Sequence, residues 1–293
     1  ALQVVGSGAA FAAVKEDGSV VTWGSPSGGG NSDDVRAELA SGVLQVVGNN
    51  SAFSALKGDG SVVAWGSPTW GGNCDEVKSQ LTSGVLQLVG KFGAFAAVKN
   101  DGSVVTWGQS SLGGNSVGVN SELAGGVLEV VGTGSAFAAI REGGSVVTWG
   151  DPSGGGNSHE VSTKLTGGVL QIVGNRNAFA AVKENGSVVT WGLPENGGVS
   201  DEVQSQLASG VLQVVGTSNA FAAVKEDGSV VTWGYPGGGG NSDEVQSQLA
   251  CSVLEVVGNL GSFAAVKEDG SVVTWGDPTC GGDSSSVQTH FIQ

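Results

Sequence analysis

The stretch that decides the fold of this chain is residues 43–66, which read VLQVVGNNSAFSALKGDGSVVAWG. It contains three short apolar runs, at residues 43–48, 52–57 and 61–66. Short runs rich in valine are typical of β-strands. Between the last two runs, Asp59-Gly60 predicts a tight hairpin, because glycine accepts the positive φ that such a turn requires. The stretch therefore predicts consecutive antiparallel strands.

The same stretch recurs seven times along the chain. A tryptophan marks each copy at a constant interval of 42 residues: Trp23, Trp65, Trp107, Trp149, Trp191, Trp233 and Trp275. The hairpin glycine is present in every copy: Gly18, Gly60, Gly102, Gly144, Gly186, Gly228 and Gly270. A fixed period of this length indicates a repeat architecture. We predict a single domain over residues 1–293, with repeats at 1–42, 43–84, 85–126, 127–168, 169–210, 211–252 and 253–293.

The strands are apolar on both faces, so both faces of each sheet need a cover. Small residues such as Ala12 and Ala13 let neighbouring sheets approach closely. The first and last repeats resemble the middle ones and lack the polar caps of an open solenoid. We therefore predict an all-β, seven-bladed β-propeller whose terminal blades close on each other.

The last segment of each repeat allows two interpretations. Val245 and Leu249 are four residues apart, as on a helical turn. Val35, Ala37 and Leu39 alternate instead, as on a strand. The segment is either a fourth, outer strand or a short helix that replaces it.

The recurring order G-x-x-x-x-F-x-A-L/V-K-x-D-G-S-V-V-x-W-G within residues 43–66 resembles the repeat of RCC1-like (regulator of chromosome condensation) propellers. The resemblance covers essentially the whole chain and implies a seven-bladed propeller. Members of that family are mostly interaction modules, and its founding member is a nucleotide exchange factor for a small GTPase that also binds chromatin. Seven equal units leave no room for an inserted exchange wedge, and no basic tail is present. We therefore expect the fold without exchange activity or DNA binding. The Gly-His and Trp-Asp signatures of WD40 repeats are absent.

The net charge of −15 disfavours binding to nucleic acid or to an anionic membrane surface. No apolar run approaches the 18 residues of a membrane-spanning helix, so we expect no membrane insertion. The chain contains no methionine, and we expect a processed chain or a piece of a longer one. Cys74, Cys251 and Cys280 occupy different repeat positions, which favours free thiols, although a pair between Cys251 and Cys280 stays open.

Residues for catalysis or metal binding do not cluster in the sequence. The two histidines, His159 and His290, lie in different repeats and at different repeat positions. Paired carboxylates such as Asp33-Asp34 recur with the repeat, so we interpret them as a surface turn or a helix N-terminus. The glycine-rich runs lack a P-loop lysine and serve tight turns. We predict no enzyme, no cofactor and no metal site.

Two repeat positions form candidate rings. One is cationic, and either recruits an anion or pairs locally: Lys15, Lys57, Lys99, Arg141, Lys183, Lys225 and Lys267. The other is on the first strand, and either lines a channel or satisfies internal hydrogen bonds: Gln3, Gln45, Gln87, Glu129, Gln171, Gln213 and Glu255.

Comparison of the seven copies shows two loops that vary, one after the first strand and one after the tryptophan. Both should lie at the same end of each blade. Function commonly resides on such loops, and aromatic residues and arginine anchor interfaces. The candidate binding residues are Trp70, Lys91, Phe92, Arg176, Tyr235, Asn49, Asn50 and Leu260.

We expect a monomeric scaffold that binds a protein partner through this variable-loop face. One alternative is a propeller that binds carbohydrate or another small ligand. A second alternative is a purely structural repeat protein, engineered or recently amplified.

Overall fold

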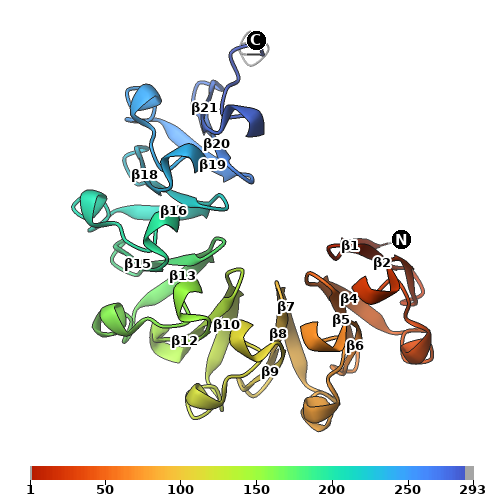
Figure 1. Ribbon diagram of the computed structural model, residues 1–293. Helices are drawn as coiled ribbons and strands as arrows, with labels where there is room; N and C mark the ends of the chain where they lie inside the picture. Colours follow the sequence, from red (N-terminus) through yellow and green to blue (C-terminus); the bar gives the residue numbers. More distant parts are fainter. Residues whose placement is uncertain (1, 288–293) are drawn as a thin grey trace. The chain divides into compact units, whose positions relative to one another are not determined.

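The computed structural model describes residues 2–287, and each repeat forms one three-stranded antiparallel sheet (Figure 1). The seven sheets are blades of the β-propeller type, which confirms the predicted fold class. The strands are β1 (Gln3–Gly6), β2 (Ala10–Val14), β3 (Val20–Gly24), β4 (Val43–Gly48), β5 (Ala52–Lys57), β6 (Val62–Gly66), β7 (Val85–Lys91), β8 (Ala94–Lys99), β9 (Val104–Gly108), β10 (Val127–Gly132), β11 (Ala136–Arg141), β12 (Val146–Gly150), β13 (Val169–Gly174), β14 (Ala178–Lys183), β15 (Val188–Gly192), β16 (Val211–Gly216), β17 (Ala220–Lys225), β18 (Val230–Gly234), β19 (Val253–Gly258), β20 (Ser262–Lys267) and β21 (Val272–Gly276).

Short 3₁₀ helices follow the third strand of each sheet, so the interpretation as a fourth strand is wrong and the short helix is correct. The first group of helices lies in the loop after the tryptophan: η1 (Pro26–Gly28), η3 (Pro68–Trp70), η5 (Ser110–Leu112), η8 (Pro152–Gly154), η10 (Pro194–Asn196), η12 (Pro236–Gly238) and η14 (Pro278–Cys280). The second group replaces the strand: η2 (Asp33–Val35), η4 (Asp75–Gln80), η6 (Val117–Val119), η9 (His159–Lys164), η11 (Asp201–Val203) and η13 (Asp243–Val245). One further turn, η7 (Glu142–Gly144), is the hairpin of the fourth repeat.

The helical alternative prevails because of local hydrogen bonds. Asn31 Oδ1 accepts the Asp33 amide proton at 2.7 Å, and the Leu39 amide donates to the Val35 carbonyl at 3.0 Å. This turn buries Leu39 to 2 % exposure, and its carbonyl accepts the Val20 amide at the edge of the sheet. The paired carboxylates accordingly begin a helical turn, as one of the two interpretations expected.

The chain divides into two compact units, residues 1–142 with 147–152, and residues 143–146 with 153–293. Within each unit the same packing recurs between successive sheets. In the first unit, Ala10 and Ala12 of β2 lie in one core cluster with Phe53 and Trp65 of the next sheet. In the second unit, the corresponding clusters contain Ala178 with Trp233, and Ala220 with Trp275.

From the second sheet onward, a hydrogen bond from the tryptophan joins each sheet to the repeat before it. Trp65 Nε1 donates to the Gly29 carbonyl at 3.0 Å, and its ring stacks on Phe53 at a centroid distance of 5.4 Å. Gly29 has a φ of 92°, and a Cβ atom there would lie 2.6 Å from the Phe53 ring, so only glycine fits. The bond recurs as Trp107–Gly71, Trp149–Gly113, Trp191–Gly155, Trp233–Gly197 and Trp275–Gly239.

The hairpins between the second and third strands are almost identical. Gly18 has a φ of 73°, and Asp17 Oδ1 accepts the Ser19 hydroxyl at 2.6 Å and the Ser19 amide at 2.9 Å. The Ser19 hydroxyl, the Ser19 amide and Lys15 together lower the Asp17 pKa to about 2. The serine two residues on also lowers the pKa of Asp59, Asp101, Asp227 and Asp269. These turns are constant structural elements.

Candidate functional site

The two variable loops of a repeat lie side by side because one side chain links them. In the second repeat, Asn49 Oδ1 accepts the amide protons of Ser51 at 3.0 Å and Ala52 at 2.9 Å. Asn49 Nδ2 donates to the Trp70 carbonyl in the other loop at 2.6 Å. The two loops therefore share one end of the sheet, as the sequence predicts. We call this side chain the loop staple.

The staple recurs with different side chains. Its bond to the second loop is Ser7–Gly28 at 2.9 Å, Asn175–Asn196 at 2.6 Å, Thr217–Gly238 at 2.9 Å and Asn259–Cys280 at 2.6 Å. Each of these side chains both accepts and donates a hydrogen bond, which the role requires. Asn49 is only 7 % exposed, so its amide serves its own loops and does not face a partner.

The residues that follow the staple form rows of loop tips. In the first unit, the Gly8 amide donates to the Asn50 carbonyl at 2.9 Å, and the Asn50 amide donates to the Phe92 carbonyl at 3.0 Å. In the second unit, the Arg176 amide donates to the Ser218 carbonyl and the Ser218 amide to the Leu260 carbonyl, both at 3.1 Å. Backbone bonds thus hold consecutive tips in line. The side chains of Asn50, Phe92, Arg176 and Leu260 are exposed.

The third repeat departs from this pattern. Lys91 occupies the staple position, and an ammonium group has no lone pair with which to accept the loop amides. Strand β7 instead continues through Lys91, which pairs with Ala94, and leaves Phe92-Gly93 as a two-residue turn. Phe92 has a φ of 27°, a region that side-chain-bearing residues rarely adopt. Its ring is 49 % exposed. The lysine substitution therefore accompanies a tighter turn that presents an aromatic ring.

The Phe92 ring meets Trp70, which reaches it from the second loop of the preceding repeat. The two ring centroids are 6.4 Å apart, with an interplanar angle of 46°. Gly93 is buried beneath them: a Cβ atom there would lie 3.0 Å from the Trp70 ring and 2.8 Å from Leu112. We call Trp70, Phe92 and Leu112 the aromatic cluster. Leu112 was not among the predicted site residues; the signal for it was its place in a variable loop.

Lys91 precedes Phe92 in the sequence, and its side chain extends toward Gly132 of the fourth repeat. Surrounding protein atoms desolvate its ammonium group and lower its pKa, although the side chain as a whole remains exposed. Its aliphatic stem lies at Gly132, where a Cβ atom would collide with it. Among the described residues, the Lys91 ammonium group forms no ion pair.

The other predicted binding residues lie in the second unit. Arg176 and Leu260 are exposed members of one row of tips, and Leu260 is 73 % exposed. Tyr235 is 53 % exposed, and its ring lies close to Gly237 and Gly238. The structure brings Trp70 and Phe92 together, whereas Tyr235 and Arg176 come from loops of different repeats.

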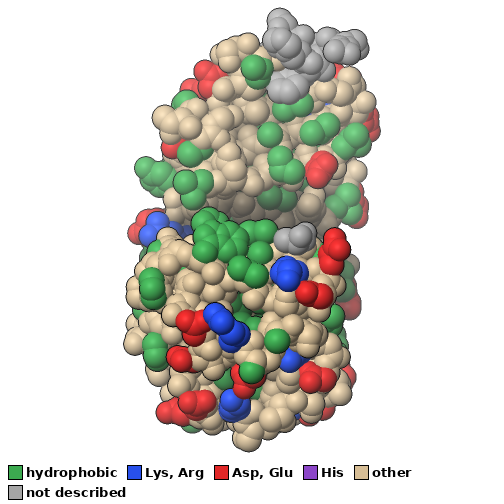
Figure 2. All heavy atoms as spheres, turned by 90° about the vertical axis from the view of Figure 1, so that its right-hand side faces the viewer, with side chains coloured by type: hydrophobic (Ala, Val, Ile, Leu, Met, Phe, Trp, Pro, Cys, Tyr) green, Lys and Arg blue, Asp and Glu red, His purple; other side chains and the backbone are tan. Residues whose placement is uncertain are grey.

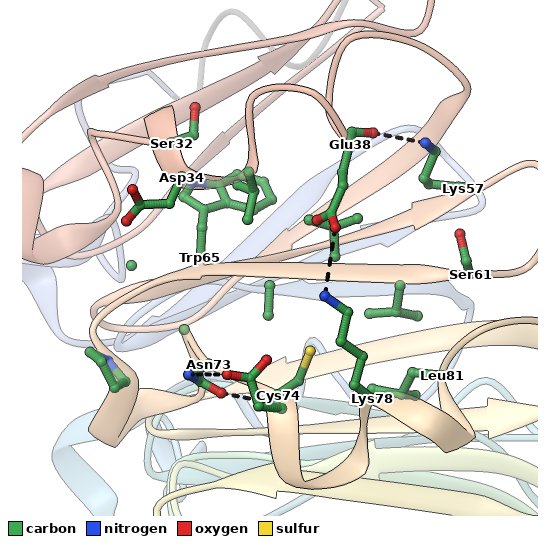
Figure 3. A pocket seen from close by; sticks show the side chains of 18 of the residues that line it. Ser32, Asp34, Glu38, Lys57, Ser61, Trp65, Asn73, Cys74, Lys78 and Leu81 are labelled. Carbon is green, nitrogen blue, oxygen red and sulfur yellow. Dashed lines mark hydrogen bonds and ion pairs between the residues drawn. The ribbon is translucent and has the colours of Figure 1, made fainter.

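Grooves between successive sheets form a second kind of candidate site (Figure 3). One groove, with a volume of about 850 Å³, lies between the first two repeats. Lys57 Nζ donates to the Glu38 carbonyl at 2.8 Å, and Lys78 Nζ lies 3.6 Å from the Glu38 carboxylate. Similar grooves of about 810, 840 and 750 Å³ occur at other junctions. Trp65 lines the first groove but is only 4 % exposed, so it offers no open ring face for stacking.

The two candidate rings serve internal hydrogen bonds where the structure shows their partners. Gln3 exchanges two bonds with the Val46 backbone of the next sheet, at 2.8 and 3.1 Å, and Gln87 bonds Val130 in the same way. In the cationic ring, Lys15 pairs with Asp17 at 3.3 Å. Other members donate to backbone carbonyls of the preceding repeat: Lys57 to Glu38, Lys183 to Lys164 and Lys267 to Gln248. For these three members, the local partner is therefore a backbone carbonyl.

Chemically reactive groups remain scattered. Within residues 2–287, no three His, Cys, Asp or Glu side chains come together as a metal site would require. Cys74, Cys251 and Cys280 are free thiols, and burial raises the pKa of Cys74. No helix in the described part of the chain is long and apolar enough to cross a membrane. His290 lies outside the described residues.

Comparisons with known proteins give structural likenesses only. No protein-family model and no curated protein sequence matches the chain. The ectodomain of the receptor kinase CR4 from Physcomitrella patens has a TM-score of 0.48 at 13 % identity, with coverage of 94 % of this chain and 73 % of that one. Prp20p, the RCC1 of Saccharomyces cerevisiae, whose structure is described with its binding to Gsp1p and histones, has a TM-score of 0.46 at 17 % identity, with coverage of 94 % and 71 %. Solved structures of RCC1 are thus among those that resemble this chain. At TM-scores below 0.5, these likenesses carry no inference about partner or activity.

Proposed function

We propose that this chain is a non-enzymatic interaction module that binds a protein partner through its variable-loop face, with the aromatic cluster as the anchor. The observation that carries the proposal is the meeting of Trp70 and Phe92. The two rings come from loops of different repeats, and Phe92 is presented by a turn that only the third repeat has. Trp70 is partly buried and Phe92 is 49 % exposed, and tryptophan and other aromatic side chains dominate the binding energy at interfaces.

The surroundings of the cluster support one kind of partner. Lys91, which ends β7 just before Phe92, is an exposed cation on a chain whose net charge is −15. A partner that presents an apolar side chain beside a carboxylate would bury the rings and pair with Lys91.

Carbohydrate binding has less support. Ligand sites are lined by hydrophobic and aromatic side chains with a few polar groups. In the described grooves, Trp65, Trp107, Trp233 and Trp275 are each only 4 % exposed, and each donates its Nε1 proton to a carbonyl of the preceding repeat. These indoles are structural.

The test begins with a pull-down from source extract, read by mass spectrometry, with two baits. One is the natural chain, and the other has all fourteen variable loops, two in each of the seven repeats, set to the sequence of the first repeat. A protein held by the first bait and lost by the second is then purified. Its affinity is measured for the natural chain and for single-site variants.

The decisive variants are Trp70→Gly and Phe92→Gly. Gly28 and Gly8 stand at these positions in the first repeat, so the protein already tolerates glycine there. The matched control is Leu44→Ser, which removes a 68 % exposed leucine on β4, outside the loops. We expect each glycine variant to weaken binding at least tenfold and the control to leave it unchanged. Equal binding by all three variants would refute the proposal that the aromatic cluster anchors the partner. Equal capture of proteins by both baits would refute the proposal that the variable-loop face binds them.

A further inference from the structure

Every repeat exposes one leucine to water at the start of its first strand. These leucines are between 62 % and 72 % exposed: Leu2, Leu44, Leu86, Leu128, Leu170, Leu212 and Leu254. The recurring leucine near the end of a repeat is instead at most 2 % exposed: Leu39, Leu81, Leu123, Leu165, Leu207 and Leu249. A single exposed leucine is ordinary on a protein surface, whereas a recurring set at one place marks an interaction site.

From the second repeat onward, a bulge in the strand turns this leucine outward. In the second repeat, Val43 pairs with Lys57, and the next pair along the ladder is Gln45 with Leu56. Leu44 lies between the two pairs as an extra residue without a partner on the neighbouring strand. The same shift of register surrounds Leu86, Leu128, Leu170, Leu212 and Leu254. A bulge re-aims a side chain, so the exposure of these leucines is a feature of the backbone.

The exposed leucine is constant although its neighbours vary. The residue that follows it is glutamine in some repeats and glutamate in others. A Cβ atom at Gly58 would lie 3.9 Å from Leu44, so the first residue of the hairpin is also a neighbour. That hairpin residue is Glu16, Gly58 and Asn100 in the first three repeats. A leucine that stays exposed while the residues around it change indicates a requirement for its apolar side chain.

The exposed leucines stand on neighbouring strands within each compact unit. In the first unit, Gln3 exchanges two hydrogen bonds with the Val46 backbone of the next sheet, and Gln87 bonds Val130 in the same way. The first strands β1, β4, β7 and β10 therefore follow one another side by side, each with its leucine at the same end. Strands β13, β16 and β19 do so in the second unit. We call the exposed leucines of one unit its leucine row.

The leucine row lies at the end of the sheets opposite the variable loops. The Val43 amide donates to the carbonyl of Gly18, in the hairpin of the preceding repeat, at 3.0 Å. Leu44 comes directly after Val43, and the strand then runs to Gly48, just before the first variable loop. The row thus borders the constant hairpins and is a strand's length from Asn49.

The hairpins beside the leucine row carry more acidic than basic side chains. In the first unit, the exposed acids of the hairpins and of the position after the leucine are Glu16, Asp17, Asp59, Asp101, Glu129 and Glu142. The cations there are Lys15, Lys57, Lys99 and Arg141. Of these, Lys15 pairs with Asp17, and Lys57 donates to a carbonyl of the preceding repeat. Figure 2 shows acidic and hydrophobic side chains interspersed over the face that it presents.

We propose that the leucine row is the docking site for an amphipathic helical segment with an apolar face bordered by lysine or arginine. The apolar face would cover the leucines, and the cations would reach the hairpin carboxylates. A second copy of this chain is a poorer occupant, because its own acidic hairpins would meet those of the first and each chain has a net charge of −15. The site is distinct from the aromatic cluster and does not depend on the proposed function.

The test is the binding of two synthetic helical peptides to the full chain, measured by the fluorescence anisotropy of a label on the peptide. One peptide has leucine on one face and lysine along its edges, and the other has glutamate in place of every lysine. The variant combines Leu44→Ser, Leu86→Ser and Leu128→Ser, which alter exposed side chains only. The control is Phe92→Gly, at the opposite end of the sheets.

We expect the lysine peptide to bind the natural chain and Phe92→Gly equally well, and the triple leucine variant at least about tenfold more weakly. Urea unfolding with an unchanged midpoint would show that the triple variant is folded. Equal binding of the lysine peptide to the natural chain and to the triple variant would overturn the proposal. Tighter binding of the glutamate peptide would also overturn it, because the hairpins would then not select a basic partner.

A second variant covers the case in which the leucine variant does not fold. Asp59→Asn with Asp101→Asn leaves the leucines in place, and Asn185 shows that asparagine accepts both hydrogen bonds of this hairpin. This variant should bind the lysine peptide about threefold more weakly or worse, with a smaller effect of added salt. Unchanged affinity and salt dependence would overturn the proposal.

Light scattering separates this partner from a second copy of the chain. We expect the natural chain and the triple leucine variant to have the same molar mass. A natural chain that is a dimer, and a triple variant that is a monomer, would overturn the proposal because the occupant of the row would then be a second copy.

Discussion

Replacement of the loop staple in the second repeat gives a sharp test of how the variable face is built. In Asn49→Ala, the amide protons of Ser51 and Ala52 and the Trp70 carbonyl lose their partner. Ala52 is fully buried, and Asn49 is 7 % exposed, so water replaces these bonds poorly. Each hydrogen bond contributes about 0.5–1.5 kcal/mol net, and an unsatisfied buried group costs about 1–3 kcal/mol. We expect Asn49→Ala to lower the free energy of opening of these loops by about 2–4 kcal/mol.

The matched control is Asn49→Thr, because the sixth repeat uses threonine for the same purpose. Thr217 Oγ1 accepts the Ala220 amide at 3.1 Å and donates to the Gly238 carbonyl at 2.9 Å. We expect this variant to cost less than about 1 kcal/mol, since the bonds are replaced in kind.

Amide hydrogen exchange is the appropriate assay, because repeat proteins open locally as well as globally. The Ala52 amide should exchange about 30-fold to 1000-fold faster in Asn49→Ala, the rate that the free-energy loss implies, and near the natural rate in Asn49→Thr. Equal exchange in the natural chain and in Asn49→Ala would refute the staple. Equal damage by both substitutions would show that the role is specific to the asparagine amide.

Three further predictions follow from single contacts. Gly71→Ala should lower the free energy of unfolding in urea by about 2–4 kcal/mol, because φ is 88° there and a Cβ atom would lie 2.8 Å from Phe95. The control is Gly118→Ala, which should leave the free energy of unfolding nearly unchanged because no atom lies within 4 Å of its Cβ position. The hairpin aspartates have lowered pKa values in the folded chain, so their contribution to stability is complete above about pH 4 and is lost as the pH falls toward the Asp17 pKa of about 2. Measurement of unfolding at a series of acidic pH values should show this loss. Asp17→Asn should make the loss smaller, because Asn185 accepts the same two hydrogen bonds in the fifth repeat without titrating. Lys91→Asn should restore the loop staple and so slow hydrogen exchange at the Ala94 amide, and it should weaken partner binding tenfold or more. Unchanged binding would show that the turn of the third repeat plays no part in the proposed function.

The regular part of the fold was predictable because the residues that build it act locally. A glycine at φ near 73° after an aspartate determines the hairpin, and valine-rich runs on each side determine the strands. The outer segment was ambiguous because Val245 and Leu249 suit a helical turn, while the equivalent residues of the first repeat also alternate. Hydrogen bonds within the segment decide it, and they depend on the polar residue before the helix rather than on the apolar pattern.

The candidate site was predictable only in part, for a reason that two neighbouring residues show. Asn49 and Asn50 are chemically identical and adjacent, yet Asn49 is buried as the staple and Asn50 is exposed at a loop tip. The difference comes from a carbonyl 21 residues away, at Trp70, which the sequence pattern does not reveal. Trp70 and Phe92 are also 22 residues apart, and their contact depends on how one sheet packs on the next.

Variation among the repeats nevertheless contains the missing information when it is compared with the chemistry that each position requires. The staple position varies among serine, threonine and asparagine in six repeats, and all three both accept and donate hydrogen bonds. Such variation preserves a function of the fold and does not indicate a binding site. Lys91 is the one change that abolishes this chemistry, and at the same place the turn tightens, Phe92 takes a positive φ and two rings meet. A change that gives up a structural hydrogen bond and gains an aromatic pair with one exposed ring is the change expected where a repeat protein has acquired a partner.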